Sequence, residues 1–487
     1  MGSINPSDLA FASATEVAGI IQRGKITSQE IIGHIFDRIE SYNPEINAIV
    51  TLVRDEAMAR ARAADEALSK GEVWGPLHGV PCTAKDCFEI AGVRTTAGSP
   101  SLSDHFPEKD ATAVARLKAA GAVIIGHTNV PIMAGDWQSY NKVFGTTNNP
   151  WDPSRTPGGS TGGGAAALAA GLSYLSLGSD IGGSIRLPAH FCGVYGHKPS
   201  INVAPLDGYI PKPVYDPPIL YVAGSLARSA EDLRAALEIV GGPGPEEAKS
   251  YSWDLLPERG ERLSDYRLGY VVDHPACSLT HGVKEVILDT VEKLKERGVR
   301  LEEGWPEWVE PVEQYTTYRF LLASTYAGFL RDDEYEAKKK QASKQDGTYE
   351  AILAKAWTAP HKHFLAAQAE RREARAAWQE YFVNHDAFLL PPSFLPAFPH
   401  DHSLPYWGRR LQTPEGLRNY EDIYFWISFA TLTGLPATVA PVGRTKNGLP
   451  VGIQIIGPYL EDATPIDIAA KISDVIGGFT PPEGYEA

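Results

Sequence analysis

Apolar and polar residues near the start of the chain follow the period of an α-helix. Apolar side chains recur three and four positions apart, which predicts a buried helical face made of Ile31, Ile32, Ile35, Phe36 and Ile39. The S/T-x-x-E patterns that begin at Ser13 and Thr27 are typical of helix starts, because the hydroxyl and the carboxylate cap backbone N–H groups there. We therefore expect two helices separated at Gly24, and an alanine-rich third helix over residues 54–69.

Helices and strands alternate further along the chain. A helical pattern over residues 111–121 is followed by a short apolar run, 122–126, that is typical of a buried strand. The two element types return as a strand over 266–273 and a helix over 282–298. Such alternation predicts an α/β fold with a central sheet.

Residues 313–420 break this alternation. A charged and aromatic helical stretch runs to about residue 385, and a proline-rich loop with many aromatic side chains follows it. We expect this region to be a helical insertion that shapes a substrate pocket, carried by a single large domain over residues 1–487.

The composition is typical of a globular protein, with 43% hydrophobic and 22% charged residues. The net charge of −15 opposes binding to nucleic acid or to an anionic membrane. No segment has the pattern of a secretory signal, and no apolar run reaches the length of a membrane span. No CxxC pair occurs among the four cysteines, so we expect a reducing, cytoplasmic location for a chain that contains Cys82, Cys87, Cys192 and Cys277.

A glycine-rich loop, PGGSTGGGAAALAAG at residues 157–171, is the first candidate for chemistry. A phosphate-binding loop needs a Gly-Lys-Ser/Thr ending, which is missing, and a dinucleotide-binding loop needs a preceding strand, which the prolines before it disfavour. The G-x-S-x-G pattern around Ser160 is that of an α/β-hydrolase nucleophile, but no strand precedes it and no histidine is marked as its base. On the loop alone, close packing of small residues is favoured over either of these functions.

A second glycine-serine turn, GSDIGGSIRLPA, begins at Gly178, where a short apolar run typical of a strand ends. Gly182 and Gly183 allow a tight turn in which successive N–H groups converge, and this arrangement suits an oxyanion. Ser184 stands at the end of the turn, where a nucleophile is expected. This second motif favours catalysis over packing alone.

A serine hydroxyl needs a base to become a strong nucleophile. The segment GVPCTAKD, residues 79–86, has Lys85 among small and apolar residues. Burial there would favour the neutral amine, which is the form that accepts a proton. The alternative is a surface lysine paired with Asp86.

Together, GVPCTAKD, GGSTGG and GSDIGGSIRLPA resemble the amidase signature family in sequence, order and spacing. LTGLPATVAPVG and GLPVGIQIIGP near the end of the chain are similar to further family landmarks. The resemblance implies a central mixed β-sheet covered by helices on both faces. It also implies a triad in which Ser184 is the nucleophile, Ser160, preceded by a cis peptide bond, is the bridging serine, and Lys85 is the base.

The resemblance assigns supporting roles as well. The oxyanion would be held by the backbone N–H groups of Ile181, Gly182, Gly183 and Ser184. Asp180 and Arg186 would brace the turn without reacting. Thr161 stands where the family usually has a second serine, and Thr431 where many members have asparagine, and neither departure touches the triad positions.

We expect the substrate pocket to draw on Met133, Asp136, Trp137 and Tyr195. The mechanism requires neither a metal nor an organic cofactor. Two histidine pairs each lack a third metal ligand and are expected at the surface: His361 with His363, and His400 with His402. The cysteines close to the motifs are expected to be small buried apolar residues.

These features predict an enzyme that hydrolyses carboxylic amides through an acyl-enzyme, with esters and carbamates (urethanes) open to the same chemistry. The aromatic, acidic chain favours an uncharged, moderately bulky small molecule such as an aryl amide or an aryl carbamate. Two alternatives stay open. One is the glutaminase subunit of a tRNA-dependent amidotransferase, which works with a protein partner, and the other is an α/β-hydrolase esterase that uses Ser160 and a histidine. A homodimer is one assembly left open.

Overall fold

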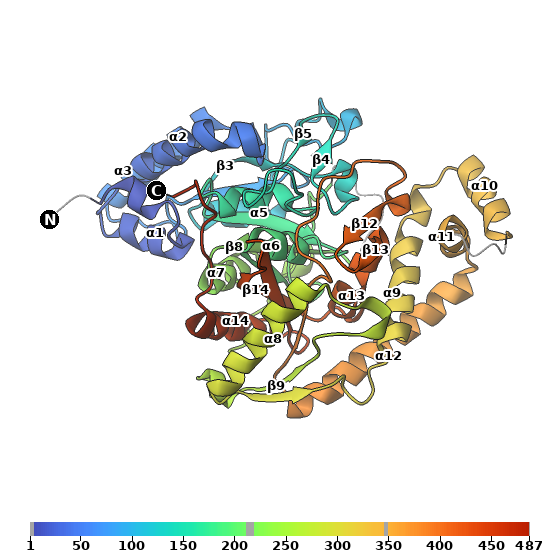
Figure 1. Ribbon diagram of the computed structural model, residues 1–487. Coiled ribbons are helices and arrows are strands. Elements are labelled where there is room, and N and C mark those ends of the chain that lie inside the picture. Colours follow the sequence, from blue (N-terminus) through green and yellow to red (C-terminus); the bar gives the residue numbers. More distant parts are fainter. Residues whose placement is uncertain (1–3, 211–218, 345–348, 487) are drawn as a thin grey trace.

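A mixed β-sheet forms the centre of the computed structural model, which describes residues 4–210, 219–344 and 349–486 (Figure 1). Within these residues the sheet has eleven strands. In spatial order they are β1 (Ile49–Leu52), β3 (Val123–Thr128), β2 (Pro81–Lys85), β6 (Leu175–Asp180), β8 (Val222–Ala227), β7 (Tyr195–Lys198), β14 (Ala437–Arg444), β15 (Pro450–Ile456), β11 (Ala387–Leu390), β9 (Arg267–Tyr270) and β10 (Arg300–Glu303).

The strands of this sheet pair in both directions. β3, β2 and β6 run parallel, and so do β11, β9 and β10. The pairs from β6 through β8, β7, β14 and β15 to β11 are antiparallel. Two short hairpins stand apart from the sheet: β4 (Tyr140–Asn141) with β5 (Gly145–Thr146), and β12 (Arg410–Thr413) with β13 (Gly416–Asn419).

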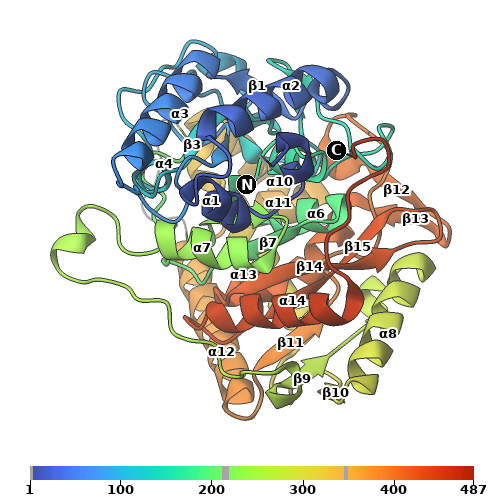
Figure 2. The same cartoon turned by 90° about the vertical axis from the view of Figure 1, so that its left-hand side faces the viewer.

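Helices cover both faces of the sheet. On one face, α5 (Gly162–Ala169) and α6 (Arg186–Cys192) pack against Leu226 of β8 and Val439 of β14. On the other face lie α7 (Ala230–Val240), α8 (His281–Glu296) and α14 (Ala463–Ile476), and Figure 2 shows α7 and α14 in front of the sheet. The predicted α/β fold, with a mixed sheet between helices, is confirmed.

The first helices agree closely with the sequence prediction. They are α1 (Ala14–Gln22), α2 (Ser28–Ile46), α3 (Arg54–Ser69) and α4 (Thr112–Ala119). Thr27 and Glu30 form the complete capping box at the start of α2, and the predicted apolar face of α2 is buried. Strand β6 is longer than predicted, because it continues two residues past Gly178 to Asp180.

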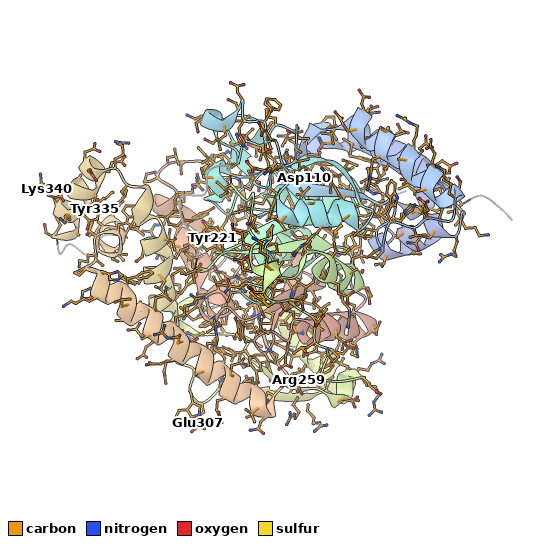
Figure 3. All side chains as sticks on the ribbon, turned by 180° about the vertical axis from the view of Figure 1, so that it is seen from behind. Asp110, Tyr221, Arg259, Glu307, Tyr335 and Lys340 are labelled. Atoms are coloured by element: carbon orange, nitrogen blue, oxygen red, sulfur yellow. The ribbon has the colours of Figure 1, made fainter. Side chains whose placement is uncertain are left out.

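The region of the expected insertion is helical at first. It contains α9 (Pro311–Thr325), α10 (Asp332–Ala342), α11 (Tyr349–Trp357) and α12 (His361–Asn384), and α13 (Tyr424–Thr433) follows the loop after it. Tyr335 and Lys340 mark α10 at the periphery of the molecule in Figure 3, whereas Tyr221 lies near its middle. Strand β11 falls inside the range 313–420 but belongs to the central sheet, since it pairs with β15 and β9 and is buried there. A core strand therefore interrupts the expected insertion.

Candidate active site

Lys85 ends β2 in the interior of the sheet, and its side chain is fully buried. Its Nζ atom donates hydrogen bonds to the Ser160 Oγ at 2.6 Å and to the Ser179 Oγ at 2.9 Å. In the part of the chain that the structure describes, no carboxylate forms a salt bridge with Lys85. The Asp86 carboxylate instead accepts a hydrogen bond from the Thr96 N–H at 2.9 Å, so a surface pair of Lys85 with Asp86 is excluded.

Burial changes the proton affinity of Lys85. It lowers the pKa of the ammonium from its ordinary 10.5 to about 8, although the Cys87 thiol and the Asp180 carboxylate act in the opposite direction. The cause is that a charged group loses hydration in the interior and hydroxyls replace only part of it. A substantial fraction of Lys85 is therefore neutral near pH 8.

The glycine-rich loop brings Ser160 to this lysine. The peptide bond between Gly159 and Ser160 is cis, as the family resemblance implies. A Cβ atom on Gly159 would lie 2.5 Å from the carbonyl oxygen of Asp136, and one on Gly163 would lie 2.4 Å from the backbone nitrogen of Asn129. Side chains have no room at these two positions, so the glycines serve close packing and the placement of Ser160 together.

Ser184 lies in the turn between β6 and α6, next to the glycine-rich loop. The Thr161 N–H donates to the Ser184 carbonyl at 3.1 Å, and the Thr161 hydroxyl donates to the Ser179 carbonyl at 3.4 Å. These bonds hold the two serine segments side by side. The structure thus joins Lys85 of β2 to Ser160 of the loop before α5 by a side-chain hydrogen bond. The backbone bond from Thr161 holds the segment of Ser184, which lines a largely apolar cavity, against the same loop.

Ser179 and Tyr209 extend this group of hydroxyls. The Ser179 Oγ accepts from Lys85 and is hydrogen-bonded to the Tyr209 hydroxyl at 2.8 Å. Sequence reasoning missed both residues. Ser179 lies inside the second motif and was within reach of that reasoning, whereas Tyr209 carries no local signal.

The turn at residues 181–184 offers fewer N–H groups than expected. The Gly183 N–H donates to the Asp180 carboxylate at 2.9 Å and is therefore occupied. Among the described residues, no acceptor binds the N–H groups of Ile181, Gly182 or Ser184. Of the four N–H groups expected to bind the oxyanion, three therefore stay available.

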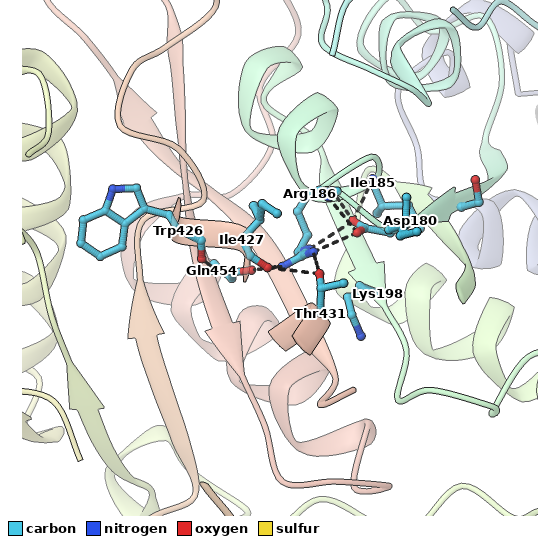
Figure 4. A network of polar contacts seen from close by, with 12 residues as sticks. Asp180, Ile185, Arg186, Lys198, Trp426, Ile427, Thr431 and Gln454 are labelled. Atoms are coloured by element: carbon cyan, nitrogen blue, oxygen red, sulfur yellow. Dashed lines mark hydrogen bonds and ion pairs between the residues drawn. The ribbon is translucent and has the colours of Figure 1, made fainter. Parts of the chain in front are cut away.

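Asp180 and Arg186 form a buried ion pair beneath the turn (Figure 4). Arg186 donates to both carboxylate oxygens, at 2.8 and 3.1 Å, and the Ile185 N–H adds a third bond at 3.0 Å. Burial alone would raise the pKa of Asp180, but the Arg186 guanidinium outweighs it and holds the pKa at about 2. Arg186 also donates to the Thr431 hydroxyl at 2.7 Å, so threonine supplies an acceptor at this position.

A cavity of about 420 Å³ opens at Ser184, Ile181 and Gly182. This size suits a small organic ligand. Its wall is mainly aromatic and aliphatic, with contributions from the loop before β4, from α9 and α11, and from α13; prominent members are Trp137, Tyr140, Leu322, Tyr326, Trp357 and Tyr424.

Of the four residues expected in the pocket, two line the cavity and two do not. Asp136 and Trp137 line the cavity. Tyr195 does not, because β7 points its side chain to the opposite face of the sheet, where its hydroxyl contacts Ser473 of α14. Met133 lies in the lining loop, but its side chain is outside the wall and 39% exposed. Neither Tyr195 nor Met133 is therefore part of the cavity wall.

Both charged groups of the cavity wall are paired within the protein. The Asp136 carboxylate accepts from Arg409 and from the Tyr420 hydroxyl, each at 2.6 Å. Arg319 forms an ion pair with Glu421. Arg409 escaped the sequence analysis, since nothing in its local pattern links it to a residue more than 260 positions earlier.

Other candidate groups are accounted for by their surroundings. Within residues 4–210, 219–344 and 349–486, no three His, Cys, Asp or Glu side chains gather as a metal ion would need. His402 stacks on Tyr140 at 3.8 Å between ring centres and is partly buried, so it is less exposed than a free surface histidine. All four cysteines are buried and free, and burial raises the pKa of the Cys87 thiol to about 12.

The α/β sheet and the buried lysine with its serine partners are consistent with an enzyme that cleaves amide bonds. Comparison with known proteins agrees with this class: the family model described as Amidase matches residues 30–465. The chain belongs to the amidase family and is an enzyme that acts on amide C–N bonds.

Relatives and solved structures give the extent of this similarity. A glutamyl-tRNA(Gln) amidotransferase subunit of Thermus thermophilus is 34% identical over 92% of this chain and 94% of its own. The solved structure of the corresponding subunit from Thermotoga maritima is 26% identical, with a TM-score of 0.77 and 99% of both chains covered. A bacterial aryl acylamidase shares the fold, with 23% identity, a TM-score of 0.81 and coverage of 99% and 98%.

Proposed function

We propose that this chain is a serine amide hydrolase. Neutral Lys85 accepts the proton of Ser160 while Ser160 accepts the proton of Ser184, and the Ser184 Oγ forms a bond to the substrate carbonyl carbon. The carbonyl π electrons become an oxyanion, which receives N–H hydrogen bonds from Ile181, Gly182 and Ser184 itself. Collapse of the oxyanion breaks the C–N bond, and the relay returns the proton to the leaving nitrogen. Water then cleaves the acyl-enzyme by the same relay.

The observation that carries this proposal is the environment of Lys85. The side chain is fully buried, its pKa is lowered to about 8, and its hydrogen-bond partners are the hydroxyls of Ser160 and Ser179. A lysine kept for stability inside a protein is normally paired with a carboxylate. An amine that contacts hydroxyls instead is suited to take up and return a proton.

The cavity supports an uncharged and aromatic substrate. Most of its wall is apolar, and Asp136 and Arg319 already have partners inside the protein. A charged substrate would have to break one of these pairs or remain unpaired, and both are costly in a desolvated site. Aryl amides fit best, and aryl esters and aryl carbamates present the same carbonyl to Ser184.

A glutaminase that works inside an amidotransferase complex is the second candidate. It is supported by the relatives named as subunits of glutamyl-tRNA(Gln) amidotransferase, at 34% identity over 92% of the chain. Glutamine carries an ammonium and a carboxylate, and each needs an opposite charge in the pocket. The paired state of Asp136 and Arg319 argues against this substrate.

A substrate panel with the purified chain separates the two candidates. We expect 4-nitroacetanilide, an aryl ester and an aryl carbamate to be turned over by the chain alone, with much smaller kcat/KM for acetamide and glutamine. Ammonia release from glutamine that appears only in the presence of amidotransferase partner proteins would contradict the first proposal and establish the second.

Variants test the assigned roles in the same assay. Lys85→Ala is expected to lower kcat/KM by a factor on the order of 10²–10⁴, because the proton relay loses its base. His402→Gln, beside the cavity, is expected to stay within about tenfold of the parent, since no histidine takes part in the relay. A histidine variant as inactive as Lys85→Ala would revive the esterase alternative that uses Ser160 with a histidine.

A further inference from the structure

Two aromatic side chains hold the turn at residues 181–184, part of which lines the cavity. The Tyr318 hydroxyl of α9 donates to the Ile181 carbonyl at 3.1 Å, and the Trp137 indole N–H donates to the Gly182 carbonyl at 2.8 Å. Both side chains are almost completely buried. Burial raises the pKa of Tyr318 well above its ordinary value of 10.0, so its hydroxyl remains a donor.

These two bonds fix the directions of two peptide planes. In a planar trans peptide the C=O and the following N–H point in opposite directions. A donor on the Ile181 carbonyl therefore sets the direction of the Gly182 N–H. A donor on the Gly182 carbonyl does the same for the Gly183 N–H, which is already bound to Asp180 at 2.9 Å.

The two peptides consequently differ in what they can bind. The Gly182–Gly183 peptide is satisfied at both ends by Trp137 and Asp180. The Ile181–Gly182 peptide is held at its carbonyl by Tyr318, and in the described part of the chain its N–H has no acceptor. Of these two N–H groups, that of Gly182 remains for a ligand oxygen, and a donor on the opposite carbonyl also strengthens it as a donor.

Packing around Gly182 reinforces this geometry. A Cβ atom there would lie 3.2 Å from the Tyr424 ring and 3.7 Å from the Tyr318 hydroxyl. Tyr424 in turn packs edge-to-face on Trp137 at 4.2 Å and on Tyr318 at 5.8 Å between ring centres. The three rings leave the peptide little freedom to rotate.

We propose that Tyr318 is a positioning residue that aims the Gly182 N–H at the developing oxyanion. This inference rests on the proposed serine mechanism. Tyr318 is outside the cavity wall, whereas Leu322, one turn later on α9, is part of it. Helix α9 therefore joins the wall that receives the substrate to the peptide that stabilises the transition state, and removal of the hydroxyl should affect the transition state without affecting substrate contacts.

Tyr318→Phe tests this role, since it removes one hydroxyl and keeps the ring. We expect kcat for 4-nitroacetanilide to fall about tenfold, the effect of one buried hydrogen bond, with KM unchanged. The matched control is Tyr174→Phe, which removes a buried tyrosine hydroxyl bonded to the Leu9 carbonyl at 2.9 Å, away from the turn. We expect the kcat of this control to stay within about twofold of the parent value.

An inhibitor that forms a tetrahedral adduct supplies a second measurement. When the Ser184 Oγ adds to the carbonyl carbon of 2,2,2-trifluoroacetophenone, its proton passes through Ser160 to Lys85 and the ketone oxygen becomes an oxyanion. Tyr318→Phe should weaken inhibition by this ketone by the same factor as it lowers kcat/KM, because both report on the oxyanion.

Three results would overturn the role of Tyr318. The first is a Tyr318→Phe variant whose kcat and ketone affinity both stay within about twofold of the parent values. The second is a rise in its KM at constant kcat. The third is a loss of kcat in Tyr174→Phe as large as that in Tyr318→Phe. Failure of the proposed function is distinguishable from these, because the parent would then neither turn over the anilide nor bind the ketone.

Discussion

At the residue scale, two buried cations of the site have opposite surroundings. Arg186 is matched by the Asp180 carboxylate, whose pKa is held at about 2, and this pair stays charged. Lys85 is matched by hydroxyls, and its pKa falls to about 8. The Asp180–Arg186 pair therefore stabilises the turn as a lasting ion pair, whereas Lys85 can lose and regain a proton.

The lowered pKa of Lys85 predicts the pH dependence of the reaction. Only the neutral amine accepts a proton, so kcat/KM for an uncharged anilide should fall about tenfold per pH unit below about pH 8 and level off above it. Initial rates between about pH 6 and pH 10 measure this, with intrinsic fluorescence as a check on folding. A limb centred near 6.5, the ordinary pKa of histidine, would instead assign the base to a histidine.

At the element scale, the start of α5 decides where Ser160 lies. Gly163 approaches the backbone of Asn129 so closely that the helix and the end of β3 are in direct main-chain contact. A side chain on Gly163 would push α5 away, and the loop that carries Ser160 would move with it.

Gly163→Ala is therefore expected to lower the free energy of unfolding by about 1–3 kcal/mol, the cost of overpacking, and to reduce kcat. Gly33→Ala is the matched control, because Gly33 lies inside α2 and a Cβ atom there meets nothing within 4 Å. This control should gain about 0.5–1 kcal/mol from helix propensity. Chemical denaturation measures both, and an equally stable Gly163→Ala variant would contradict the close contact.

Elements with strong local signals could be predicted from sequence. The bounds of α3 and the capped start of α2 were visible because alanine content, apolar spacing and a capping box all lie within a few residues. The end of β6 was misplaced, since Ser179 and Asp180 look like turn residues although they pair with β8. Strand β11 was hidden inside a region read as an insertion, because its pairing with β9 and β15 is remote in sequence.

At the scale of the whole molecule, sheet order assembles the site. β2 lies beside β6, so Lys85 at the end of one strand meets Ser179 near the end of the other, just before the turn that carries Ser184. Lys85, Ser160 and Ser184 all lie in recognisable sequence motifs, and these residues could therefore be proposed from the sequence. Contacts such as Tyr318 with Ile181 and Arg409 with Asp136 join distant segments without any motif, and only the fold reveals them.

Among the described residues, none of the helices has the length and apolar character that a membrane span requires.

Segments from across the molecule also enclose the site. Aromatic side chains from the loop around residue 137, from Tyr326 just after α9, from α11 and from α13 converge on one cavity beside Ser184. The substrate that we propose follows from this convergence and not from any single motif.

The most direct test of the account maps the acyl group on the intact enzyme. The chain is mixed with 4-nitrophenyl acetate, quenched with acid during turnover, digested and analysed by mass spectrometry. We predict an acetyl group on Ser184, absent in Ser184→Ala and formed more slowly in Lys85→Ala by a factor on the order of 10²–10⁴. An acetyl group on Ser160, or equal acylation without Lys85, would contradict the account.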